Sequence, residues 1–303
     1  MALITVMLVV AVLTAIVSRL TLSNQVWIRQ VESGASLAQA RQVARAAEHW
    51  IGLLLVKDTN DHDGHQDPWA RPLPPFPVGW GELDGRIEDM QGRFNLNNLV
   101  TPDGEVAKVS LERFRRLLRI LELTPGIADA AVDWVDADAL PAGGGGAEDS
   151  YYMGRQPPYK AANRPFHGAE ELRLVRGVDQ EAWQRLRPHV AALPEATGVN
   201  VNTATAEVLA ATVRPWGSPR QALARGEEWR RRTDREPLAS PEAFTEAALP
   251  GDPQEPVQGI TTQTQFFRAH IRAQFGQVDH RLATIYRRAN NRAEVVRHRR
   301  EIP

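Results

Sequence analysis

The sequence predicts an α+β fold: a long N-terminal helix packs on an antiparallel sheet, and a large all-α domain is inserted between the strands. Three observations support this prediction. The chain opens with an uncharged apolar stretch and continues without proline to Lys57. Alternating apolar and polar residues, the pattern of a half-buried strand, occur in two places far apart in the chain. The roughly 150 residues between those two places show helical spacing instead.

The first segment, residues 1–20, is expected to span a membrane. It carries no charge before Arg19. Its first 17 residues form a helix of about 26 Å, close to the roughly 30 Å hydrocarbon core of a bilayer. One continuous helix of about 85 Å, reaching Lys57, is favoured over an anchor and a separate core helix. Gly34 is the position at which such a helix would break.

Residues 21–57 are expected to form the amphipathic continuation of this helix. Apolar residues recur there at gaps of three and four, which places them on one helical face: Ala40, Val43, Ala47, Trp50 and Leu54. This stripe predicts that the second half of the helix packs against another part of the chain.

Composition excludes several classes of function. The formal net charge is −1, from 36 basic and 37 acidic residues, which argues against a chain that wraps nucleic acid. The chain has no cysteine, so disulfides, thiolate metal sites and cysteine nucleophiles are excluded. It also contains neither a GxSxG nor an HExxH motif. We therefore predict no catalytic residue, and a membrane-anchored hydrolase is the least favoured function.

Residues 58–108 are predicted to contribute the first part of the α+β domain. They begin with a loop rich in Asp, Gly and Pro. Its carboxylates do not match the spacing of an EF-hand, so a solvated acidic turn is favoured over a metal site there. The alternation from Leu83 to Glu88 predicts a half-buried strand, and a second short alternation follows through Phe94 and Leu96. The nearby asparagines are expected to bind backbone groups of a turn.

Residues 109–255 are predicted to form the inserted helical domain. Helical spacing indicates helices at 111–121 and 127–134. Further along, Asn202 or Thr203 is suited to the N-cap of another helix. The Asn-Thr-Ala opening of this segment resembles helix-hairpin-helix DNA-binding modules, although no glycine-rich hairpin accompanies it. A membrane-anchored DNA-binding protein therefore remains the alternative function.

Carboxylates crowd around a glycine run at residues 143–146. They are Asp133, Asp136, Asp138, Glu148 and Asp149. Closely spaced oxygen ligands suit a hard cation such as Ca²⁺. No strict loop spacing is met, so composition alone leaves a metal site and a solvated acidic loop equally open.

Residues 256–303 are predicted to close the sheet and to end in a basic tail. Phe267 to Phe275 alternates strictly, and Gly276 allows a turn into an antiparallel partner at 278–286. The tail that follows is expected to be frayed and solvated.

Several segments within residues 1–209 carry a joint resemblance to one family. They read MALITVMLVVAV, GRIEDMQGRFNLNNLV, DWVDAD, GAEDSYY, PYKAANRPF, ELRLV and NVNTATAEVL. Together they resemble the general secretion pathway protein K family, the large minor pseudopilins of type II secretion systems. The resemblance implies a pilin-like fold and a structural protein that caps or initiates the tip of the periplasmic pseudopilus, which drives export of folded proteins across the outer membrane. It implies the minor pseudopilins I, J and H as partners, and no nucleic acid.

The resemblance also implies how the N-terminus is placed. A short basic leader would be removed by the prepilin peptidase before a residue that matches Met1, followed by methylation. The N-terminus would then be cytoplasmic and the bulk periplasmic, with a single pass of the inner membrane. Pilin-like subunits carry at mature position five a Glu that pairs with a neighbouring subunit, and this chain has Thr5 there. A neutral residue suits a subunit with no neighbour above it, since a buried unpaired carboxylate is costly.

Two further expectations follow from the resemblance. Trp27 and Val31 are expected to pack against the helices of partner subunits. Calcium is expected as a structural ion of the helical domain, and we assign it to the five carboxylates named above.

Overall fold

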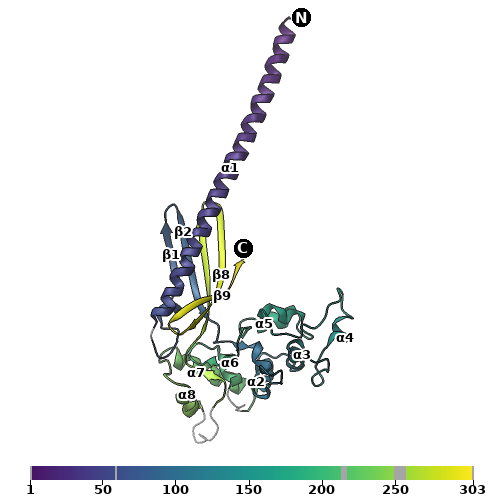
Figure 1. Ribbon diagram of the computed structural model, residues 1–303, viewed down its shortest axis with the longest axis vertical. Helices are drawn as coiled ribbons and strands as arrows, with labels where there is room; N and C mark the ends of the chain where they lie inside the picture. Colours follow the sequence, from purple (N-terminus) through teal and green to yellow (C-terminus); the bar gives the residue numbers. More distant parts are fainter. Residues whose placement is uncertain (1, 59, 213–216, 249–256, 302–303) are drawn as a thin grey trace.

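The computed structural model describes residues 2–58, 60–212, 217–248 and 257–301. One long helix, α1 (Ala2–Lys57), projects from the rest of the molecule, as Figure 1 shows. A sheet lies beside its C-terminal half, and a helical region lies beyond its C-terminal end. The predicted α+β class, with a long helix, an antiparallel sheet and inserted helices, is confirmed.

The helix α1 is continuous through Gly34, as the absence of proline predicts. Its buried face consists of residues spaced by three or four: Ala40, Ala44, Ala47, Ile51 and Leu55. The predicted stripe is therefore right at Ala40 and Ala47 but wrong at Trp50, which is 49% exposed. Small side chains dominate the buried face because the helix lies close to the sheet there.

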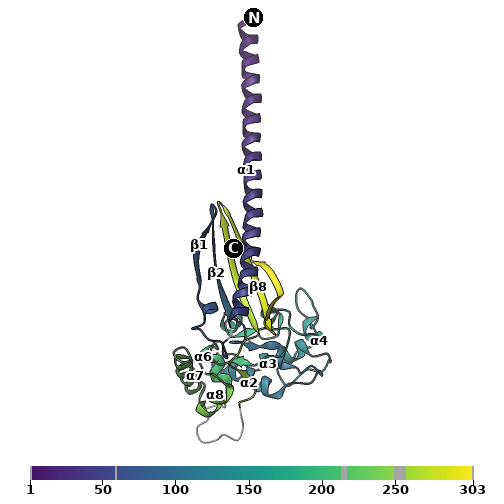
Figure 2. The same ribbon diagram turned by 60° about the vertical axis from the view of Figure 1, so that its left-hand side comes forward.

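The main sheet has five antiparallel strands in the order β1-β2-β7-β8-β9. They are β1 (Leu73–Val78), β2 (Gly81–Asp89), β7 (Phe266–Phe275), β8 (Val278–Ala289) and β9 (Arg292–Glu301). Strands β2 and β7, which the helical region separates in the sequence, pair from Glu82–Gln274 to Asp89–Phe267. Figure 2 shows α1 lying along this sheet.

Alternate residues of β7 pack against α1. Ala269, Ile271 and Ala273 are buried in the cluster that contains the buried face of α1. Two hydrogen bonds join β8 to the helix: Tyr286 Oη donates to the Glu48 carbonyl oxygen (2.7 Å), and Thr284 Oγ1 contacts Glu48 Oε1 (2.7 Å). The predicted strands at 267–275 and 278–286 are confirmed as β7 and β8.

Two strands occupy segments in which the sequence predicts none. β1 lies in the expected proline-rich loop, and it is an edge strand, where proline is tolerated because one side needs no ladder hydrogen bonds. β9 lies in the expected frayed tail. Asn290 and Asn291 have φ values of 51° and 57°, which turn the chain tightly so that the tail pairs with β8.

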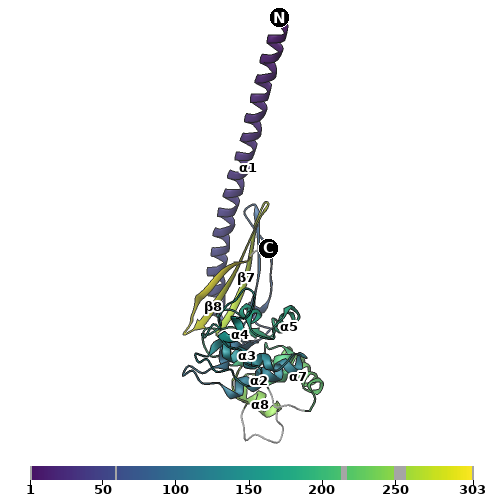
Figure 3. The same cartoon turned by 90° about the vertical axis from the view of Figure 1, so that its right-hand side faces the viewer.

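The helical region is formed by short helices, several of which are labelled in Figure 3, and by two small two-stranded sheets. The helices are α2 (Lys108–Ile120), α3 (Gly126–Val135), α4 (Asp149–Tyr152), α5 (Gln180–Leu186), α6 (Ala206–Thr212), α7 (Pro219–Thr233) and α8 (Pro241–Ala248). The described 3₁₀ helices are η1 (Pro68–Ala70), η2 (Leu96–Leu99) and η3 (Ala169–Leu174). One small sheet pairs β3 (Phe94–Asn95) with β4 (Val190–Ala191). The other pairs β5 (Val199–Asn200) with β6 (Ile260–Thr261). The helices predicted at 111–121 and 127–134 are confirmed as α2 and α3.

The alternation through Phe94 does not extend the main sheet, because β3 pairs in parallel with β4 inside the helical region. The asparagines beside it bind backbone groups, as predicted, but of distant segments. Asn95 Oδ1 accepts from Leu193 N (3.0 Å), and Asn97 Nδ2 donates to Leu193 O (2.8 Å) and Phe166 O (3.0 Å). These hydrogen bonds therefore connect the start of the helical region to its later parts.

Candidate functional site

The N-terminal half of α1 exposes apolar side chains that no other described part of the chain covers. They include Leu3, Ile4, Val6, Met7, Leu8, Val9, Val10, Val12, Leu13, Ile16 and Val17, each at least half exposed. By length and composition this is the one described helix that could cross a membrane. The expected anchor therefore stands free of the globular part, available to lipid or to other helices.

The residues expected to act in filament assembly lie at the tip of this helix. Thr5 Oγ1 donates to the Ala2 carbonyl oxygen (2.8 Å), so its hydroxyl is satisfied within the helix. Met1 lies outside the described residues. Further along, Trp27 is 63% exposed and Val31 is 51% exposed. Both are therefore accessible to a partner helix, as the expected packing role requires.

Three of the five carboxylates expected to bind calcium come together beside α3. One ligand oxygen of each of Asp136, Asp138 and Glu148 lies within 4.8 Å of the others. Asp136 follows the last residue of α3, and Glu148 precedes the first residue of α4. The glycine-containing loop between these helices brings the end of α3 close to the start of α4.

The other two expected ligands make different contacts. Asp133 is fully buried, and its two oxygens accept from the backbone amides of Ala142 (2.8 Å) and Ala147 (2.5 Å). Asp149 Oδ1 accepts from Ala161 N (2.9 Å), and its Oδ2 lies 3.5 Å from Lys160 Nζ. Asp133 therefore holds the loop between α3 and α4, whereas Asp149 binds the later segment that contains Lys160 and Ala161.

Asp129, which sequence reasoning did not select, also holds this loop. It lies one helical turn before Asp133, and its Oδ2 accepts from Gly145 N (3.2 Å) while Arg115 Nη2 contacts its Oδ1 (2.7 Å). A Cβ on Gly145 would lie 2.4 Å from the Gly126 Cα, so only glycine lets the loop approach α3. The helical spacing of Asp129 and Asp133 is the signal that could have identified this pair.

The electrostatics of the group fit a hard cation. Asp136 Oδ1 and Glu148 Oε1 are buried and have no hydrogen-bond partner among the described residues. Burial, followed by repulsion from Asp138 and Asp133, raises the pKa of Asp136 to about 6. Burial, followed by repulsion from Asp133, Asp136, Asp138 and Asp149, raises the pKa of Glu148 to about 7. Converging oxygens with unsatisfied negative charge suit Ca²⁺, which accepts irregular oxygen cages.

The segment that resembles a DNA-binding module faces the interior. Asn202 is buried and bonds both backbone groups of Leu238, through Oδ1 to the amide (2.8 Å) and Nδ2 to the carbonyl (3.0 Å). Thr203 Oγ1 contacts the buried Asp89 carboxylate (2.5 Å). The expected N-cap role is not found either, because α6 begins only at Ala206. Asn202 therefore connects two parts of the helical region, and Thr203 connects the helical region to strand β2.

The acidic turn after α1 is not the solvated turn that its composition favours. Asp63 is 1% exposed and Asp67 is 7% exposed. Asp63 forms an ion pair with Arg288 of β8, which comes from the far end of the sequence. Only the tertiary structure supplies this partner.

Comparison with known proteins points to one family. The model described as "Type II secretion system (T2SS), protein K" matches residues 92–195. The type II secretion system protein K of Pseudomonas aeruginosa is 43% identical over 225 residues, an alignment that covers 69% of this chain and 66% of that protein. The protein of the same name from Aeromonas hydrophila is 37% identical over 234 residues, covering 70% of this chain and 69% of that protein. The alignments thus span about two thirds of each relative.

A solved structure agrees in fold. One chain of the crystal structure of the GspK-GspI-GspJ complex from the type 2 secretion system of enterotoxigenic Escherichia coli matches with a TM-score of 0.69. The match covers 90% of this chain and 100% of that chain, at 22% sequence identity.

Proposed function

Because the chain belongs to the type II secretion system protein K family, we propose that it is a minor pseudopilin that caps or initiates the tip of the periplasmic pseudopilus. It acts by assembly rather than by catalysis, in the export of folded proteins across the outer membrane. The observation that carries the proposal is α1, whose first half is apolar and uncovered while its second half is built into the sheet.

In this proposal the uncovered half of α1 is first a membrane anchor and then an assembly surface. It crosses the inner membrane once, with its N-terminus cytoplasmic and the sheet and helical region periplasmic. Residues 2–18 carry no charged side chain, which suits the apolar interior of a bilayer. The prepilin peptidase is the proposed processing enzyme, and N-terminal methylation is proposed to follow.

The tip position is supported by two features of the chain. The helical region lies beyond the C-terminal end of α1, at the pole opposite the N-terminus (Figure 1). The helical region would obstruct a neighbouring subunit stacked above it within the shaft of the pseudopilus. At the tip of the pseudopilus it is tolerated, because no subunit lies above it there. Thr5 is neutral, and a subunit with no neighbour above needs no carboxylate at this position.

The proposed partners are the minor pseudopilins I, J and H of the same secretion system. The GspK-GspI-GspJ complex is a property of the Escherichia coli proteins, and we extend it to this chain on the basis of family and fold. Trp27 and Val31 are proposed to contact the helices of these partners.

Site-specific crosslinking tests this assembly. A photoreactive amino acid replaces Trp27 or Val31 in the full-length chain, coexpressed with minor pseudopilins I and J. We expect crosslinks to the N-terminal helices of the partners. The control position is Leu140, which is 76% exposed but lies in the helical region, and it should give no crosslink to those helices. Crosslinks from Trp27 that reach only its own globular part would contradict the proposal.

We also propose that Asp136, Asp138 and Glu148 hold a structural calcium ion. The support is the convergence of their oxygens and the two buried oxygens that lack partners within the described residues. The ion would tie the end of α3 to the start of α4.

Thermal melting with and without a calcium chelator tests this site. An ion present at 100 times its Kd stabilises the folded state by about 2.7 kcal/mol, which corresponds to several degrees in Tm. We expect Asp136→Asn to reduce the calcium-dependent rise in Tm. Asp103→Asn, the same change at an exposed position, should leave it intact. An equal rise in Asp136→Asn and the unmodified chain would refute the assignment.

A further inference from the structure

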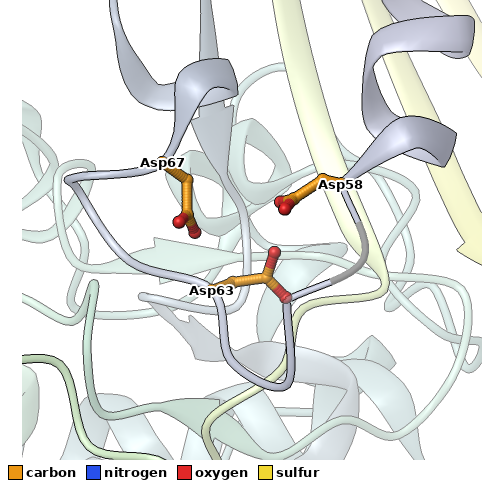
Figure 4. Close-up of side chains that lie close together, drawn as sticks. All are labelled: Asp58, Asp63 and Asp67. Carbon is orange, nitrogen blue, oxygen red and sulfur yellow. The ribbon is translucent and has the colours of Figure 1, made fainter.

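A second group of carboxylates lies where α1 ends. Asp58 follows the last helical residue, and Asp63 and Asp67 belong to the loop that leads to η1. One carboxylate oxygen of each lies within 4.8 Å of the others. Figure 4 shows the three carboxyl groups turned toward one shared space. Asp63 and Asp67 are buried and Asp58 is half-buried, so this group is largely removed from bulk water.

The surroundings hold these carboxylates in place without satisfying all of their oxygens. Asp67 accepts from Asn60 Nδ2 through Oδ1 (3.0 Å) and from Gly64 N through Oδ2 (2.8 Å). Asp63 Oδ2 accepts from Thr264 N (2.6 Å). Asp63 Oδ1 is buried and has no hydrogen-bond partner in the part of the chain that the structure describes. Because burying an unpartnered carboxylate oxygen is costly, this atom points to a ligand.

Arg288 is the cation paired with this group among the described residues. Its Nη2 contacts Asp63 Oδ2 and its Nη1 lies 3.5 Å from Asp58 Oδ2. The guanidinium is also fixed by a hydrogen bond to Thr264 O (3.0 Å) and by the Phe267 ring, whose centroid lies 4.8 Å away. Three carboxylates against one guanidinium leave two negative charges unbalanced in a largely buried place.

We propose that Asp58, Asp63 and Asp67 bind a calcium ion at the C-terminal end of α1. A divalent cation neutralises the two unbalanced charges. The three candidate ligand atoms are all carboxylate oxygens. Ca²⁺ completes six to eight ligands with carbonyl and water oxygens in tolerant geometry, whereas Mg²⁺ demands a near-ideal octahedron. The site is separate from that of Asp136, Asp138 and Glu148 and does not follow from the proposed secretion function.

A pocket of about 600 Å³ lies beside this group of carboxylates. Its lining includes Asp58, Asn60, Thr264 and Arg288. Asp58 is the one member of the group that lines it.

A cation here would connect three parts of the molecule. Asp58 continues α1, Arg288 belongs to β8, and Thr264 lies between β6 and β7, where the helical region returns to the sheet. The proposed ion therefore connects helix α1 to both the sheet and the helical region.

Calcium binding by the full-length chain in detergent tests the proposal. Isothermal titration with CaCl₂ is performed on a chain carrying Asp136→Asn, which weakens the other calcium site. In this background we expect a remaining calcium-binding event. Adding Asp58→Asn should weaken it by at least about tenfold. Adding Asp61→Asn, the same change at an exposed position of the same loop, should leave the affinity unchanged.

The controls separate loss of the site from loss of the fold. Asparagine has nearly the same shape as aspartate, so Asp58→Asn should retain the far-ultraviolet circular dichroism of its parent. Asp67→Asn serves as a second variant with the same expected loss. No calcium binding in the Asp136→Asn background, or equal affinities in the Asp58→Asn and Asp61→Asn chains, would overturn the proposal. Neither result bears on the crosslinking that tests the secretion role.

Discussion

At the scale of single residues, Glu88 shows how a side chain on the sheet face away from α1 contributes to stability. Its carboxylate lies 2.8 Å from Arg86 Nε, 2.9 Å from Arg93 Nη2 and 3.7 Å from His270 Nε2. The nearby His270 ring, followed by the hydrogen bond from Arg86 and the positive charge of Arg93, holds the pKa of Glu88 far below its ordinary value, against the effect of burial. The folded chain therefore keeps this carboxylate ionised where the unfolded chain binds a proton.

This difference predicts a pH-dependent contribution to stability. A lowered folded-state pKa stabilises above the unfolded value of about 4.3, and the contribution is lost as the pH falls below it. We expect the unmodified chain to lose more free energy of unfolding than Glu88→Gln between about pH 5.5 and pH 3. Urea unfolding across this range measures the difference. Parallel pH profiles for the two chains would show that Glu88 is not responsible.

Gly226 is a residue that close packing requires to be glycine. It lies in α7, and a Cβ there would overlap the backbone carbonyl oxygen of Ala206 in α6. Backbone cannot move aside as the end of a flexible side chain can, so Gly226→Ala should force α6 and α7 apart. We expect a loss of about 2–3 kcal/mol in the free energy of unfolding.

Gly34→Ala is the matched control for this prediction. Gly34 is also helical, but a Cβ there meets nothing within 4 Å among the described residues. Alanine is favoured over glycine in a helix by up to about 1 kcal/mol. Thermal melting should show a lower Tm for Gly226→Ala and an unchanged or slightly higher Tm for Gly34→Ala. Equal effects would contradict the packing argument.

At the scale of elements, the pairing of β9 with β8 depends on the turn between them. Asn290 and Asn291 both adopt the left-handed conformation there. Asparagine and glycine tolerate this conformation better than other residues do, and other side chains cost about 1–2 kcal/mol. The turn therefore determines whether a strongly basic segment becomes an edge strand.

Substitutions at Asn291 test this dependence. We expect Asn291→Ala to lower the free energy of unfolding by about 1 kcal/mol and Asn291→Gly to leave it nearly unchanged. Urea unfolding measures both, and hydrogen exchange of the β9 amides reports whether the strand opens locally. A loss in Asn291→Gly as large as in Asn291→Ala would point to a lost side-chain contact instead.

At the scale of the whole molecule, the two halves of α1 differ in what they contact. Its buried residues between Ala40 and Leu55 belong to the core shared with the sheet, whereas every described residue before Ser36 is exposed. The apolar first half is therefore not part of the globular core, and it is available for the proposed membrane attachment and assembly.

Removing residues 1–33 tests this division. We expect the shortened chain to keep the Tm of the globular part, because it loses none of the buried residues of α1. It should also remain monodisperse without detergent, since the exposed apolar stretch is gone. Thermal melting and size-exclusion chromatography measure the two outcomes. A markedly lower Tm would mean that the exposed half supports the fold.

The sequence by itself determined those features that depend on local periodicity. The continuous helix α1, the strands β2, β7 and β8, and the helices α2 and α3 follow from spacing, from alternation and from the absence of proline, which act within a few residues of each other. The family resemblance was likewise available from short motifs, and the comparisons support it.

Only the tertiary structure decided which of the acidic and basic residues act together. Composition could not separate Asp136, Asp138 and Glu148 from Asp133, because the choice depends on which backbone amides the folded loop presents. It could not show that Arg288 pairs with Asp63, or that prolines and a basic tail form edge strands. Each of these depends on a partner far away in the sequence, which local pattern does not encode.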